Sequence, residues 1–142
     1  MKKKKVIKLV TIILVLLIAF LAIFMIYQNL FASSNNTRFD GVEDHKLTND
    51  EINPAKDAFK EIETIDDVDI FINSKIIKIV VNLKEDVDFE QIKTLSNQVL
   101  TNFSEDNLAF YDVEIYVESM NEESEIYPQI GYKHKSNSEF SW

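Results

Sequence analysis

The sequence predicts an α+β fold: an N-terminal transmembrane helix followed by a small α-β-β-α-β-β sandwich, with two helices on one face of an antiparallel sheet. Three observations lead to this prediction. The chain of 142 residues begins with a long apolar run, and two later segments repeat apolar residues at helical spacing. Four further segments alternate apolar and polar residues, which is typical of half-buried strands.

The apolar run predicts a membrane anchor over residues 6–27, preceded by a basic segment over residues 1–5. A bilayer core about 30 Å thick needs roughly 20 apolar residues in a helix, and Leu9 to Tyr27 supplies 19 without a charge. This run is longer than the apolar part of a signal peptide, about 7–15 residues. We therefore expect an anchor, with a cleaved signal peptide as the alternative. Lysine-rich flanks of a membrane anchor stay in the cytoplasm. The residues that follow the anchor are therefore expected outside the cytoplasm.

Residues 28–46 show no apolar periodicity and predict a flexible linker. An extracytoplasmic α+β domain is then expected over residues 47–142. It begins with a capping box, in which Thr48 and Glu51 bond each other's backbone amides. One helical face follows, and with the capping box it predicts a helix over residues 49–63; its members are Ile52, Ala55, Phe59 and Ile62.

Four strands and a second helix complete the predicted domain. Alternation over residues 67–73 and 76–83 predicts a hairpin. Helical spacing from Phe89 to Phe103 predicts a helix over residues 88–102, with Asp86 or Asp88 as its N-cap. Alternation resumes in two segments, which predict strands over residues 109–118 and 126–135. The last strand contains Pro128 and Gly131, which favour an edge position.

The charge distribution excludes one class of partner. Five of the 15 basic residues lie within the first eight positions, which leaves 10 against all 24 acidic residues in the rest of the chain, a net charge of 10 − 24 = −14. Binding of nucleic acid phosphates requires a basic surface, so we expect no nucleic acid partner. Cations and basic proteins are attracted by such a surface.

Catalytic residues and cofactors are not predicted. The chain has no cysteine, and its two histidines, His45 and His134, lie in no recognisable catalytic pattern. Asp66, Asp67 and Asp69 cluster at a strand start and are the candidate ligands for a divalent cation, although the spacing of an EF-hand loop is absent.

Aromatic residues provide the candidate surface for a partner, because tyrosine and tryptophan dominate interface hot spots. Phe71 and Tyr116 occupy outward strand positions, and Tyr127, Tyr132 and Trp142 lie near lysines at the C-terminal end. The predicted function is a single-pass, membrane-anchored extracytoplasmic binding or assembly module of a bacterial envelope complex, with a protein partner or a second copy bound. The alternatives are a divalent-cation-binding accessory or stress-response envelope protein and, less favoured, a small hydrolase near His134.

Overall fold

The structure, a computed structural model, describes residues 2–32 and 37–142. Contacts divide the chain after Thr37, so the N-terminal helix and the folded unit, Arg38–Trp142, are described separately. Helix α1 (Lys2–Ala32) covers the predicted anchor. Within the described residues, however, no helix combines the length and apolar character needed to cross a membrane. The structure therefore supports a helix over residues 6–27 but does not support the predicted membrane-spanning character.

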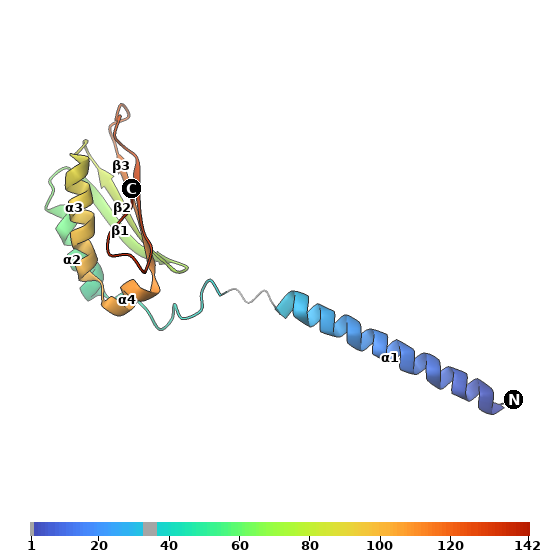
Figure 1. The fold of residues 1–142 in the computed structure, drawn as a ribbon. Helices are drawn as coiled ribbons and strands as arrows, with labels where there is room; N and C mark the ends of the chain where they lie inside the picture. The colour runs from blue at the N-terminus through green and yellow to red at the C-terminus, as the bar shows by residue number, and fades with distance from the viewer. Residues whose placement is uncertain (1, 33–36) are drawn as a thin grey trace. The chain divides into compact units, whose positions relative to one another are not determined.

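The folded unit contains three helices, one 3-10 turn and a four-stranded sheet, which confirms a mixed α+β fold. Helices α2 and α3 lie side by side on one face of the sheet (Figure 1). In chain order the elements are α2 (Asn49–Lys60), β1 (Ile65–Asn73), β2 (Ile76–Leu83), α3 (Phe89–Val99), η1 (Leu100–Asn102), α4 (Glu105–Phe110), β3 (Asp112–Ser119) and β4 (Gln129–Lys133).

The sheet has the order β1-β2-β3-β4 and is mixed, so the prediction of an antiparallel sheet is wrong at its centre. β1 with β2 and β3 with β4 are antiparallel, but β2 and β3 are parallel, with Ile76 opposite Asp112 and Leu83 opposite Ser119. The reason is the connection between them. Helices α3 and α4 return the chain from the end of β2 to the level of its start, and such a crossover joins parallel strands.

The core lies between the sheet and helices α2 and α3. Alternate strand residues point into it, and Phe59 of α2 and Ile92 of α3 are fully buried against them. Gly131 of β4 also faces the core, where Trp142 packs over it; a Cβ at this position would lie 2.8 Å from Ile115 Cγ2 and 3.0 Å from the Trp142 ring. The chain then ends along β4, because Ser141 exchanges two backbone hydrogen bonds with Tyr132 (2.8 and 2.9 Å).

Glu51 joins the start of α2 to the start of α4. Its carboxylate accepts hydrogen bonds from the Thr48 amide (2.8 Å), as a capping box requires, and from the Ser104 amide and Asn107 Nδ2 (2.9 Å each). Burial alone raises the pKa of Glu51, but these hydrogen bonds outweigh it and lower the pKa from 4.5 to about 2. A side chain predicted only as a local cap is thus a contact between two distant segments.

Helix α4 was not predicted, and its last two residues, 109 and 110, were predicted as the start of the strand over residues 109–118, which begins at Asp112 in the structure. Ser104 caps α4, since its Oγ accepts from the Asn107 amide (3.3 Å). The end of α4 contacts the last part of the predicted linker. His45 stacks on Phe110 with ring centroids 4.0 Å apart, and Tyr111 Oη donates to the His45 carbonyl (2.8 Å). These contacts attach the residues just before α2 to the end of α4.

Candidate functional site

The face of the sheet opposite α2 and α3 is the candidate site, and we call it the open face. Strand register assigns residues to it, because side chains alternate between the two faces and one set belongs to the core. The open face consists of Asp67, Asp69, Phe71 and Asn73 of β1, Ile76, Lys78, Val80 and Asn82 of β2, Asp112, Glu114, Tyr116 and Glu118 of β3, and Ile130 and Tyr132 of β4.

An apolar row crosses the middle of the open face. Val80 lies opposite Tyr116, which lies opposite Ile130 on β4. In the adjacent row, Phe71 and Tyr132 stand at the two edges of the sheet. The exposed fractions are 47% for Phe71, 57% for Ile130 and 40% for Tyr132, whereas Val80 and Tyr116 are half-buried by their neighbours. Val80, Tyr116 and Ile130 are therefore a line of neighbouring apolar residues, and Phe71 and Tyr132 add exposed aromatic rings at the two edges.

Polar contacts hold the side chains around this row in place. Lys78 Nζ and Glu114 Oε1 form an ion pair between β2 and β3. Tyr132 Oη donates to Asp112 Oδ2 (2.6 Å), and this hydrogen bond raises the pKa of Tyr132. The carboxyl of Asp112 also accepts from the Lys135 amide (2.8 Å). The hydrogen bond to Asp112 holds the partly exposed Tyr132 side chain on β4.

The structure brings together three of the five predicted partner residues. Phe71, Tyr116 and Tyr132 share the open face. Tyr127 is buried and donates from Oη to the Val87 carbonyl (2.8 Å), while Trp142 packs edge-on against Phe89 with ring centroids 5.1 Å apart. Both therefore belong to the helix-covered side.

Ile130 also belongs to the apolar row, although the sequence did not predict it as a partner residue. Its signal is weak because its core-facing neighbour is Gly131, so the usual apolar alternation is missing around it. Only the pairing of Ile130 with Tyr116 reveals that it extends the row to the edge of the sheet.

Two of the three predicted metal ligands, Asp66 and Asp69, each lie near a different lysine. Asp69 Oδ1 lies 3.3 Å from Lys56 Nζ, and Asp66 Oδ1 lies 3.9 Å from Lys84 Nζ. Over residues 2–32 and 37–142, no three or more histidine, cysteine or acidic side chains are grouped as a metal site requires. The two lysines supply the positive charge beside these carboxylates.

His134 has two neighbours that resemble members of a catalytic triad, Ser136 and Asp112. Ser136 Oγ lies 2.6 Å from His134 Nδ1, and the Ser136 amide donates to the same nitrogen (3.2 Å). Asp112 Oδ1 lies 3.9 Å from His134 Nε2, beyond hydrogen-bonding distance. Since a triad base must be oriented by its acid, this arrangement on an exposed segment has the geometry of a surface turn.

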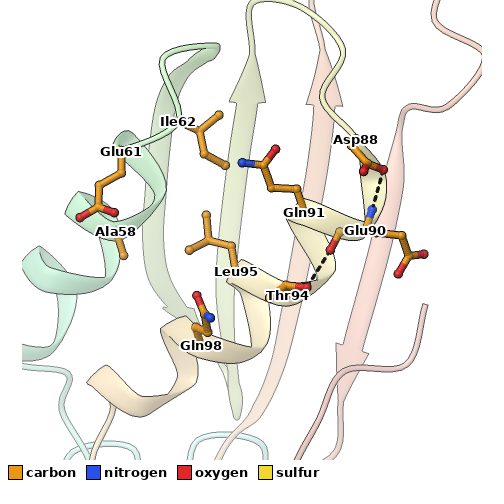
Figure 2. Close-up of a pocket in the computed structure, with 9 residues that line it drawn as sticks. All are labelled: Ala58, Glu61, Ile62, Asp88, Glu90, Gln91, Thr94, Leu95 and Gln98. Atoms are coloured by element: carbon orange, nitrogen blue, oxygen red, sulfur yellow. Dashed lines mark hydrogen bonds between the residues drawn. The ribbon is translucent and has the colours of Figure 1, made fainter.

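A second surface feature is a groove of about 560 Å³ between α2 and α3. Figure 2 shows Ile62 and Leu95 pointing into it from the two sides. Two polar side chains of the groove bond to the backbone of α3. Asp88 accepts a hydrogen bond from the Glu90 amide (3.2 Å), and Thr94 Oγ1 donates to the Glu90 carbonyl (2.9 Å). The groove thus has a short apolar floor and a rim of carboxylates and amides.

Comparison of the chain with protein-family models, curated proteins and solved structures finds no match. The folded unit is defined by its architecture, as a small mixed α+β domain with helices on one face of the sheet and an open second face.

Proposed function

We propose that the folded unit is a protein-binding module and that it binds through the open face. The observation that supports this proposal is the apolar row Val80–Tyr116–Ile130, which lies on the face of the sheet opposite α2 and α3. Aromatic and aliphatic side chains held on a rigid sheet lose little conformational entropy when a partner covers them. The proposed role is binding rather than catalysis.

Charge identifies the chemistry of the partner. Outward strand positions carry one lysine, Lys78, against five carboxylates, those of Asp67, Asp69, Asp112, Glu114 and Glu118. A second copy placed face to face would bring these carboxylates together, and juxtaposed like charges oppose association. We therefore propose a partner whose apolar residues cover the row and whose lysines or arginines surround them.

The proposal places the module outside the cytoplasm, attached to the membrane through residues 6–27. Two features support this placement. The run from Leu9 to Tyr27 contains no charge and follows four lysines, and the large apolar side chains described between Ile12 and Ile26 are exposed in α1. Exposed apolar side chains along this stretch of helix favour an apolar environment.

Topology can be measured in intact cells. We expect an added protease to digest the folded unit without cell lysis, and the chain to remain in the membrane fraction at alkaline pH. The Leu16→Lys/Phe20→Lys double variant interrupts the apolar run and is expected to release the chain. Full protection from protease, or release of the unaltered chain, would contradict the proposed placement.

Binding can be tested with a photo-crosslinking residue on the open face. Placed at position 130, it is expected to capture a basic envelope protein, and the same residue at position 94, in the groove, is the matched control. Tyr116→Glu should weaken capture about tenfold or more, because it adds a charge to the apolar row. Capture equal at both positions would contradict the proposed surface, and capture of a second copy would contradict the proposed partner.

A further inference from the structure

Lys133 is a buried lysine on the core side of β4. It lies opposite Val113, and only 3% of its surface is exposed. Burial lowers the pKa of Lys133, and Asp112 partly offsets this effect. Among the described residues, Lys133 Nζ has no hydrogen-bond acceptor and no carboxylate within ion-pair distance. The stem of Lys133 is buried, but its Nζ is not among the fully buried side-chain atoms that lack a partner, so the ammonium group remains accessible to a ligand.

Lys133 lines a pocket of about 560 Å³ at one end of the helix-covered side. The pocket is bounded by the end of α3, by α4 and by the segment that follows β4. Leu100, Phe103 and Leu108 provide apolar walls. Asn137 and Ser138 add polar groups beside Lys133. An apolar pocket of a few hundred Å³ with a small number of polar groups is the usual form of a small-molecule site.

The net charge of the pocket lining favours a ligand with one negative charge over a ligand with two. Its lining includes two lysines, Lys133 and Lys135, and one carboxylate, Glu105, which gives a net charge of 2 − 1 = +1. A single negative charge would neutralise this lining, whereas a phosphate dianion would leave an excess of negative charge in a unit that is already acidic. The walls are apolar, so the body of the ligand is expected to be apolar as well.

We propose that this pocket binds a small monocarboxylate with an apolar body, whose carboxylate pairs with Lys133. The ammonium group then gains the partner that the described residues do not supply, and the apolar body displaces water from Leu100, Phe103 and Leu108. The site is separate from the open face, since Lys133 points to the opposite side of the sheet from Tyr132. It therefore does not depend on the protein-binding role.

Benzoate is a suitable probe, and benzamide is its neutral match in size and shape. Titration calorimetry on the full-length chain in non-ionic detergent, with empty micelles as the blank, should show binding of benzoate at least tenfold tighter than that of benzamide or phosphate. Lys133→Met, which retains the length of the side chain, should remove the preference for benzoate, whereas Lys84→Met, at an exposed lysine, should not change it.

The comparison of benzoate with benzamide uses the unaltered chain, so it does not depend on the folding of a variant. Equal binding of the two compounds, or no binding of either at millimolar concentration, would overturn the proposal. Tighter binding of phosphate than of benzoate would overturn the assignment of a carboxylate. A preference for benzoate that persists in a folded Lys133→Met variant would exclude Lys133 as its partner.

Discussion

Replacement of Glu51 with glutamine is expected to lower the free energy of unfolding by about 3 kcal/mol at neutral pH. The pKa of Glu51 falls from 4.5 to about 2 in the folded chain, and each pKa unit corresponds to about 1.4 kcal/mol. The neutral amide cannot replace a carboxylate that accepts from Thr48, Ser104 and Asn107 at once. The measurement is urea unfolding at pH 7, with Glu63→Gln, at an exposed position, as the control.

The same contact predicts a pH dependence. Because the folded-state pKa of Glu51 is lowered, its contribution is fully present above the unfolded value of 4.5 and is lost as the pH falls toward about 2. The difference between the unaltered chain and Glu51→Gln should therefore shrink across this range. A difference that is as large at pH 2.5 as at pH 7 would show that the carboxylate charge is not its source.

Gly131→Val is expected to destabilise the folded unit by about 2 kcal/mol and to displace Trp142. A Cβ at this position would lie 2.8 Å from Ile115 Cγ2 and 3.0 Å from the Trp142 ring, and overpacking of a core typically costs about 1–3 kcal/mol. Trp142 is the sole tryptophan, so its fluorescence reports on the contact directly. We expect emission at longer wavelength, together with a lower midpoint of urea unfolding.

The control for this substitution is Ile130→Val, on the neighbouring position of the same strand. Ile130 faces the open side and does not contact the core, so a valine there should leave the Trp142 emission unchanged. If Gly131→Val also left the emission unchanged, the close packing of Trp142 on β4 would be contradicted.

The periodicity of the sequence predicts the helices and strands because burial imposes it directly. Phe59 and Ile92 each belong to a set of apolar residues repeated at helical spacing, and Ile77 and Val113 belong to alternating segments. The element types and the core residues follow from these two patterns. The direction of strand pairing does not follow. Alternation shows which side of a strand is buried, but it is the same for parallel and antiparallel neighbours. The parallel pairing of β2 with β3 depends on the crossover, and α4 within it is too short to show a period.

The candidate site was only partly predictable, because alternation assigns a residue to one face of the sheet only where the residue lies on a regular strand. Phe71 and Tyr116 lie on regular strands, so their outward positions could be read from alternation. Tyr127 and Trp142 flank β4 in irregular segments, and only the packing of Trp142 over Gly131 and the hydrogen bond from Tyr127 to Val87 place them on the helix side. The pocket around Lys133 combines α3, α4 and the C-terminal segment, which no local pattern brings together.

The short return of the chain along β4 affects how the sheet can grow. Because Ser141 occupies backbone groups of Tyr132, a strand from another molecule cannot add along the full length of that edge. Only β1 remains as an outer strand without such a cover among the described residues. Fibre growth by strand addition requires two accessible edges. Misassembly through β1 would therefore end at a closed pair of molecules instead of continuing as a filament.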